Sequence, residues 1–279
     1  MALYLMKEIL ADARKRGYGI GYYNGVNLEM IRAYIRAAED CKSPIIIGIA
    51  EGLMKYADFD WIAPLYLDAA RRAKVPVAVH LDHTYNFEVL MRALRAGFGS
   101  VMYDGSGLSY EENVKNSAEI AKIAHPMGVG LECELGKVGG FYNDEGIRGK
   151  NILTDPALAA DFIEKTDADF LAVSIGNTHG VYTAPPAIDL PRLGEIRMNV
   201  KIPLVLHGGS GLSDEDFRNC IRGGIVKVNI YTDVITAAIN MVRTENSRLN
   251  YTDLNMQAEQ AMYEETVKKI RIFGSNDKA

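Results

Sequence analysis

Eight short apolar runs, rich in Val and Ile, alternate along the chain with longer segments of helical periodicity. This alternation is typical of a parallel sheet whose strands are connected by helices and buried on both faces. Several helical segments begin with Asn, Ser, Asp or Thr, the residues preferred at helix N-caps. The predicted strands are Gly17–Asn24, Pro44–Ala50, Pro76–Asp82, Ser100–Asp104, Gly128–Leu135, Phe170–Gly176, Pro203–His207 and Ile225–Ile230. The predicted helices include Leu28–Glu39, Ile62–Ala73, Phe87–Ala96, Glu111–His125, Pro156–Lys165 and Asp214–Arg222.

Eight β/α units fit a closed (β/α)8 (TIM) barrel, which occupies about 250 residues, better than an open doubly wound sheet. No linker, low-complexity tract or internal repeat divides the chain, so the sequence predicts a single domain of the α/β class over residues 1–279. One further helix is predicted at about Tyr251–Phe273, followed by Gly274. The glycine-rich stretch Gly136–Gly149 is the longest irregular segment, and loops of this length are commonly functional lids.

The charge distribution narrows the classes of partner. The formal net charge is −5, and Lys and Arg are dispersed along the chain, which argues against a nucleic-acid or anionic-membrane partner. No apolar stretch approaches the roughly 20 residues that span a bilayer, and the N-terminus lacks the basic-then-apolar order of a signal peptide. These features predict a cytoplasmic protein.

Polar residues follow the predicted strands, at the end of a barrel where reactive groups are found. Three of the five histidines, His83, His179 and His207, come at the ends of different strands and are expected to converge. A strand-end histidine is more often a hydrogen-bonded structural residue than a ligand. Three imidazoles beside carboxylates, with a fourth position left to water or substrate, favour a catalytic Zn²⁺ site.

The run His207-Gly208-Gly209-Ser210-Gly211 leads into a predicted helix that begins near Ser213. Exposed N–H groups and a helix dipole at such a turn favour a phosphate. Asn229–Thr232 follows the eighth strand, and the loops after strands seven and eight are where such barrels commonly bind phosphate. The two signals together predict a phosphate site.

The motifs HLDH, ECELGKVGG, GNTHGVY, LHGGSG and KVNIYTD occur in the order and spacing of class II ketose-bisphosphate aldolases. The chain resembles that family from about Tyr22 to Asp233, with SIGNTHGVYTAPP and the closing FGSNDKA similar to its sugar-monophosphate aldolase branch. The resemblance implies reversible cleavage of a ketose 1-phosphate or ketose 1,6-bisphosphate to dihydroxyacetone phosphate and an aldehyde. The small-molecule partner would thus be a phosphorylated sugar.

The resemblance also implies roles for individual residues. His83, His179 and His207 would hold the zinc, and Asp82 would carry the proton of the hydroxyl that becomes the aldehyde. Zinc would act as a Lewis acid that stabilises the enediolate. Asp104 and Glu134 would either form a second metal position or orient a histidine, and both alternatives stay open. The substrate-binding residues would be Asn24, Gly180, Gly208, Gly209, Ser210, Asn229, Ile230, Tyr231 and Thr232, with a monovalent cation (Na⁺ or K⁺) nearby.

The chain departs from the family's pattern at the far end of the substrate. The loop GGFYNDEGIRGK replaces a Gly-Gly followed by an acidic pair, so the enediolate's proton donor is narrowed only to Tyr142, Asp144 or Glu145. Ser106 precedes Gly107 where relatives often carry His or Lys. A cation for a second phosphate is not evident, because Lys137, Arg148 and Lys150 are typical solvated loop charges. A monophosphate is therefore a reasonable substrate.

Two other function classes compete with the aldolase. A metal-dependent sugar-phosphate isomerase or epimerase on the same barrel would share the zinc ligands and the phosphate loop, without releasing dihydroxyacetone phosphate. A non-catalytic metal or sugar-phosphate binder would have no need of Asp82 beside three histidines. The family implies a homodimer or homotetramer, and the apolar residues of the C-terminal helix serve either such an interface or packing on the barrel.

Overall fold

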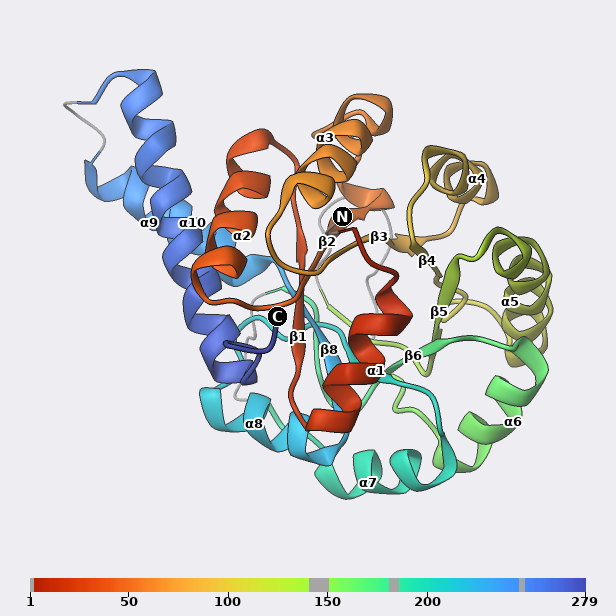
Figure 1. Ribbon diagram of the computed structural model, residues 1–279. Coiled ribbons are helices and arrows are strands. Elements are labelled where there is room, and N and C mark those ends of the chain that lie inside the picture. The colour runs from red at the N-terminus through yellow and green to blue at the C-terminus, as the bar shows by residue number, and fades with distance from the viewer. Residues whose placement is uncertain (1–2, 141–150, 181–185, 246–248) are drawn as a thin grey trace.

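The computed structural model of the protein describes residues 3–140, 151–180, 186–245 and 249–279. Eight parallel strands close into a barrel in which every strand pairs with its neighbours in sequence, and β8 pairs with β1. Helices surround the strands (Figure 1). The predicted (β/α)8 TIM barrel is therefore confirmed.

The elements alternate as the sequence pattern predicts. The strands are β1 (Ile20–Asn24), β2 (Ile45–Ala50), β3 (Val77–Thr84), β4 (Ser100–Tyr103), β5 (Gly130–Leu135), β6 (Phe170–Val173), β7 (Leu204–Leu206) and β8 (Ile225–Ile230). The α-helices are α1 (Met6–Arg16), α2 (Leu28–Asp40), α3 (Phe59–Arg72), α4 (Phe87–Ala96), α5 (Tyr110–Ala124), α6 (Pro156–Thr166), α7 (Leu190–Asn199), α8 (Asp214–Gly223), α9 (Thr232–Glu245) and α10 (Tyr251–Phe273). The short 3-10 helices are η1 (Glu51–Leu53) and η2 (His125–Met127). All eight predicted strands exist, whereas α1, α7 and α9 were not among the predicted helices.

Side chains of the strands point alternately into the barrel and toward the helices, as the two-residue period of a strand requires. The outer positions form one large apolar core with the helices. A second cluster fills the lower barrel interior and includes four side chains of α1, which lies against the starts of β3 and β8. The strand members of this second cluster are Ile20, Tyr22, Ile46, Ala78, Met102, Phe170, Ala172, Val205 and Val226. Strand β5, although fully described, adds no side chain to it, because its inward residues are Gly130, Glu132 and Glu134.

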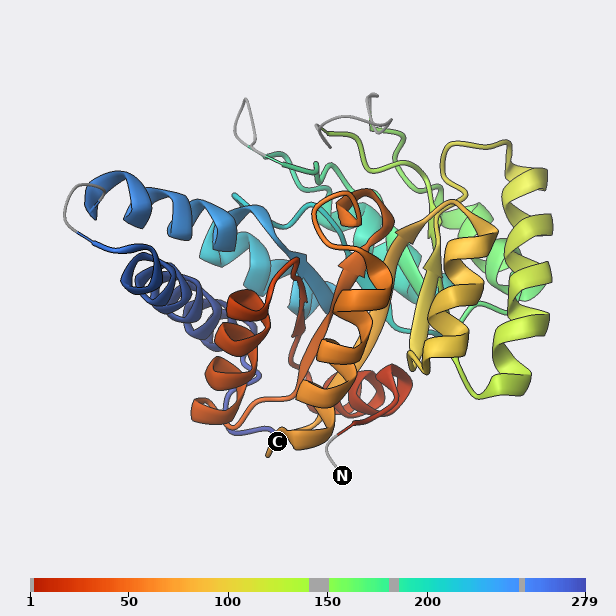
Figure 2. The same ribbon diagram turned by 90° about the horizontal axis from the view of Figure 1, so that it is seen from above.

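Helix α10 lies outside the barrel and packs along α2 and α9. Helices α9 and α10 project together to one side of the barrel (Figures 1 and 2). Helix α10 spans the predicted residues Tyr251–Phe273, and the residue that follows, Gly274, is a left-handed C-cap with a φ of 72°. Buried Met262, Ile272 and Phe273 belong to the large apolar core, so packing accounts for these apolar residues. No described helix is long and apolar enough to cross a membrane.

Candidate metal centre and phosphate pocket

Three of the five histidines meet at the carboxyl-terminal end of the barrel. His83 lies near the end of β3, and His179 and His207 follow β6 and β7. Each is buried, with an exposed fraction of no more than 5%. One ring nitrogen from each lies within 4.8 Å of the others, so the predicted convergence of the three imidazoles is what the structure shows.

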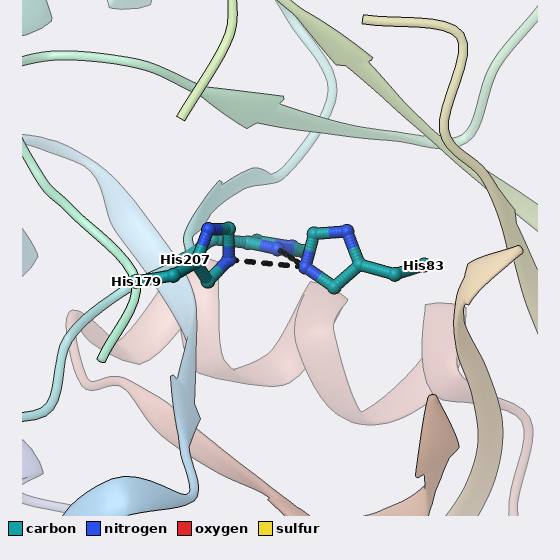
Figure 3. Close-up of side chains that lie close together, drawn as sticks. All are labelled: His83, His179 and His207. Atoms are coloured by element: carbon teal, nitrogen blue, oxygen red, sulfur yellow. Dashed lines mark hydrogen bonds between the residues drawn. The ribbon is translucent and has the colours of Figure 1, made fainter. Parts of the chain in front are cut away.

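The nitrogen atoms of this cluster face one another (Figure 3). Nε2 of His83 lies 3.1 Å from Nε2 of His179 and 2.7 Å from Nδ1 of His207. The rings stand roughly edge to face, with interplanar angles of 73° and 90° to His83. Imidazole nitrogens bind tetrahedral zinc at about 2.0–2.1 Å and then lie about 3.3 Å from one another, so small shifts of these rings would let the nitrogens share one ion.

A local irregularity brings two consecutive residues of β3 to the site. In a regular strand Asp82 and His83 would point to opposite faces. The register between β3 and β4 shifts between Leu81 and Thr84, and His83 has a φ of 40°. A bulge of this kind redirects a side chain, and a non-glycine residue in the left-handed region is strained by about 1–3 kcal/mol. This strained position is the one that brings both side chains inside the barrel.

Carboxylates hold the outer nitrogens of two imidazoles. Asp104 Oδ2 lies 2.9 Å from Nδ1 of His83, and Glu132 Oε1 lies 2.8 Å from Nε2 of His207. A neutral imidazole has one N–H, and each carboxylate accepts it, so bare nitrogens face each other at the 2.7 Å contact. Two lone pairs repel at that distance unless they share a positive charge. The donor set therefore fits a cation.

The protonation of the cluster agrees with this reading. Burial by itself lowers the pKa of His83, but the charges of Asp82 and Asp104 outweigh it and raise that pKa to about 9. Burial and the charge of His83 hold the pKa values of His179 and His207 well below the usual range. Without a metal, one proton on His83 supplies the positive charge that the cluster attracts.

Two other groups of side chains have metal-ligand spacing within the described residues. One consists of His80, Asp82 and Glu132, and it already contains a cation, because Nζ of Lys227 lies 2.8 Å from Glu132. A lysine in that place leaves little electrostatic reason for a metal there.

The other group consists of His83, Asp104 and Glu134. Asp104 accepts from Nδ1 of His83, the hydroxyl of Tyr85 and the N–H of Ser106, an arrangement that orients the imidazole. Glu134 differs, because its Oε2 is buried and has no hydrogen-bond partner among the described residues. Burial and the nearby charge of Asp104 raise the pKa of Glu134 to about 8. Asp104 and Glu134 thus have different surroundings, although the sequence predicts the same two alternative roles for both.

Asp82 lies fully buried beside the three histidines. The side-chain amide of Asn229 donates to it at 3.1 and 3.2 Å, and that of Asn24 donates at 3.4 Å. These amides come from β8 and β1, so three strands hold the carboxylate in one place. Asn24 and Asn229, predicted to contact substrate, contact Asp82 here.

A small hollow adjoins the histidines where the sequence predicts a phosphate. Its lining residues are Asn24, His179, Gly180, Gly208, Ser210, Asn229, Tyr231 and Thr232. Gly209 and Ile230, predicted with them, are not in this lining. Gly208 has a φ of 59°, and a Cβ there would lie 2.4 Å from the Thr178 carbonyl, so a glycine is required.

The helix at the hollow was not predicted. Ser213 does cap α8 as expected. However, α9 begins at Thr232, within the lining, and the Ser210 hydroxyl accepts from the N–H groups of Tyr231 and Asp233. The positive end of the α9 dipole therefore faces the hollow, which favours an anion.

Several predicted loop residues lie outside the described part of the chain. These are the three candidate proton donors, Tyr142, Asp144 and Glu145, together with Arg148 and Lys150. Lys137 is described, and its backbone pairs with that of Ile152 at the base of this loop. The described segment continues to Gly140, which pairs with His179, so its last residue lies beside a member of the histidine cluster.

Sequence reasoning missed three buried polar residues beneath the centre: His80, Glu132 and Lys227. Each lies two positions before a residue that it did identify, namely Asp82, Glu134 and Asn229. The two-residue period of a strand places such pairs on one face, so this signal was present in the sequence. Tyr85, which reaches Asp104, had no such signal.

Comparison with known proteins agrees with the geometry. The family model described as fructose-bisphosphate aldolase class-II matches residues 4–278. The fructose-bisphosphate aldolase of Thermus caldophilus is 38% identical over 301 residues, which cover 98% of each chain. The sulfofructosephosphate aldolase of Alkalicoccus urumqiensis is 36% identical over 100% of this chain and 99% of its own. The crystal structure of the YdjI aldolase from Escherichia coli K12 superposes with a TM-score of 0.90 at 36% identity, over 99% of both chains.

Proposed function

The chain belongs to the class II fructose-bisphosphate aldolase family, a family of metal-dependent lyases, and from this membership we propose that it uses one zinc ion to cleave a ketose phosphate. The products are dihydroxyacetone phosphate and an aldehyde, and the reaction is reversible. The observation that carries the proposal is the convergence of three imidazole nitrogens, two of them on rings whose outer nitrogens are held by the carboxylates of Asp104 and Glu132.

His83, His179 and His207 are the residues that would hold the ion. When bound, it supplies Lewis-acid stabilisation of the negative charge that develops on the ketose oxygens as the carbon–carbon bond breaks. Asp104 keeps His83 in the tautomer that a metal requires. Glu134, whose buried Oε2 has no hydrogen-bond partner in the part of the chain that the structure describes, is proposed as a second or alternative ligand position.

Asp82 is proposed as the base that takes the proton from the hydroxyl that becomes the aldehyde. The amides of Asn24 and Asn229 donate to its carboxylate and hold it beside the metal ligands. A base must be held within hydrogen-bond reach of the proton that it takes, and these two contacts fix the carboxylate in position. In the synthetic direction the same oxygen returns the proton to the new hydroxyl.

The hollow beside His179 is proposed to bind the phosphate that stays with dihydroxyacetone. Backbone N–H groups of the turn after β7 and the first turn of α9 supply the donors, without a basic patch. The sodium or potassium ion implied by the family belongs near this hollow. The far end of the substrate is proposed to meet the loop after β5. The names of two relatives, a fructose-bisphosphate aldolase and a sulfofructosephosphate aldolase, support a substrate that differs among family members.

A coupled assay tests the proposal. A panel of ketose 1-phosphates and ketose 1,6-bisphosphates is supplied to the protein, and released dihydroxyacetone phosphate is measured before and after dialysis against a chelator. We expect release by the metal-loaded protein, loss after dialysis, and recovery on adding Zn²⁺. An isomerised sugar phosphate as the product, or release that persists without metal, would contradict the proposal.

Two histidine variants provide a matched comparison. His179→Ala should lose both bound zinc and dihydroxyacetone phosphate release. His125→Ala is the control, because His125 lies at the end of α5 and pairs with Asp169 at 3.0 Å, outside the metal cluster. It should keep both properties.

A further inference from the structure

Lys227 is a fully buried lysine inside the barrel, one layer below the metal centre. Its Nζ lies 2.8 Å and 3.1 Å from the two carboxylate oxygens of Glu132 and 4.7 Å from the centre of the Tyr22 ring. Asp82 Oδ1 lies 4.0 Å away. A buried ammonium is costly unless it is paired, and here one carboxylate takes most of that pairing.

Among the described residues Glu132 has two hydrogen-bond partners, Lys227 and His207, and Nε2 of His80 also lies 3.6 Å from its Oε2. Oε1 accepts from Lys227 and also lies 2.8 Å from Nε2 of His207. Oε2 is the closer oxygen to Nζ. Because the lysine contacts both oxygens, it fixes the plane of the carboxylate, and that plane determines whether Oε1 reaches the imidazole.

The contact with His207 decides which ring nitrogen carries the proton. A carboxylate against Nε2 selects the tautomer with hydrogen on Nε2 and leaves Nδ1 bare toward His83. Partners of this kind around metal-binding histidines fix the ring orientation and raise the basicity of the ligand. Nζ of Lys227 lies within 4.0 Å of both Asp82 and Glu132, so the lysine also reduces the repulsion between these two carboxylates.

We propose that Lys227 is a positioning residue for the metal centre: through its two-point contact with Glu132 it holds His207 in the tautomer that binds the ion. The inference rests on the proposed function, because it takes His207 as a metal ligand. The inference assigns a positioning role to three residues in contact, Lys227, Glu132 and His207, through which the barrel interior orients a ligand of the metal centre.

Lys227→Met tests the chain by removing the charge while keeping an unbranched side chain. We expect the apparent Kd for Zn²⁺, from chelator competition at fixed pH, to rise about 10- to 100-fold. The nitrogen NMR signals of His207 in the metal-free protein should change from one Nε2–H tautomer to a mixture. The absorption spectrum of the Co²⁺-loaded protein should change as well.

Lys269→Met is the matched control. Lys269 is also buried, also lies 4.7 Å from the centre of an aromatic ring, that of Phe217, and also pairs with carboxylates, those of Asp233 and Glu265. It belongs to α10, outside the metal cluster. Its loss should lower thermal stability to a similar extent and leave Zn²⁺ affinity and the His207 signals unchanged.

The double variant Glu132→Gln with Lys227→Met separates positioning from stability, because it leaves no buried charge unpaired in this pair. We expect its melting temperature to recover toward wild type while its Zn²⁺ affinity stays reduced. Wild-type affinity in the double variant, or wild-type tautomer and affinity in Lys227→Met, would overturn the inference. If the wild-type protein itself bound no metal, the proposed function would fail instead, so the two failures are distinguishable.

Discussion

Replacing Asp82 with asparagine should separate metal binding from catalysis. The Asp82 carboxylate does not belong to the group of three histidines that would hold the zinc ion. It accepts hydrogen bonds from the side-chain amides of Asn24 and Asn229. An amide of nearly equal volume still offers one oxygen to those donors, so we expect Asp82→Asn to fold and to bind one Zn²⁺ per chain. What it loses is the ability to accept a proton.

The expected decrease in kcat follows from the proposed role of Asp82 as a general base. General-base catalysis contributes about 10²- to 10⁴-fold, which is about 2.7–5.5 kcal/mol of barrier. We therefore expect kcat for cleavage to fall by about that factor, with little change in KM, because the phosphate hollow is lined by other groups. The assay is release of dihydroxyacetone phosphate, with bound zinc measured on the same samples.

A second readout identifies the step. The proton that Asp82 takes belongs to the aldehyde half of the substrate, so exchange of the carbon-bound proton of dihydroxyacetone phosphate with deuterated water should persist in Asp82→Asn. A kcat within about tenfold of wild type would refute the assignment of the base. Equal losses in cleavage and in exchange would show that Asp82 acts on a different proton.

Three further predictions concern the surroundings of the centre. Gly208→Ala should lower the free energy of unfolding by about 2–4 kcal/mol, because alanine is strained in the left-handed region and its Cβ would clash with Thr178. Gly194→Ala is the control, because the space around Gly194 is open, and it should leave the free energy of unfolding from denaturant titration unchanged. The pKa of His83 in the metal-free protein is about 9 and a metal requires the neutral ring, so Zn²⁺ binding should release a proton and become weaker as the pH falls below 9. Calorimetry in buffers of different ionisation enthalpy measures the number of protons released. No proton release at pH 7.5 would contradict the prediction. Asp104→Ala should raise the Kd for Zn²⁺ about 10- to 100-fold; an unchanged Kd would mean that Asp104 does not orient His83.

Much of the fold was predictable from local pattern. The eight strands, the C-terminal helix and the caps at Ser213 and Gly274 follow from apolar periodicity and from the intrinsic preferences of cap residues. Helix α9 was missed because Thr232 follows β8 directly, without a loop signal to separate them. Its first turn nevertheless lines the phosphate hollow.

The candidate site was predictable in part for the same reason. Once a barrel is assumed, residues at strand ends must share one face, so His83, His179 and His207 could be grouped without coordinates. The buried polar residues beneath these histidines could not be grouped in this way. Lys227 and Glu132 lie on β8 and β5, strands that do not neighbour each other, and only closure of the barrel brings their side chains across its interior.

The sequence by itself determined which residue types stand at the ends of the eight strands, because hydrophobic periodicity and chain direction are local properties. Tertiary structure alone decided how those residues meet. The register shift that turns both Asp82 and His83 inward depends on the pairing of β3 with β4. The tautomers of His83 and His207 depend on carboxylates from β5 and from the end of β4, because hydrogen bonds between distant strands exist only after the sheet has closed.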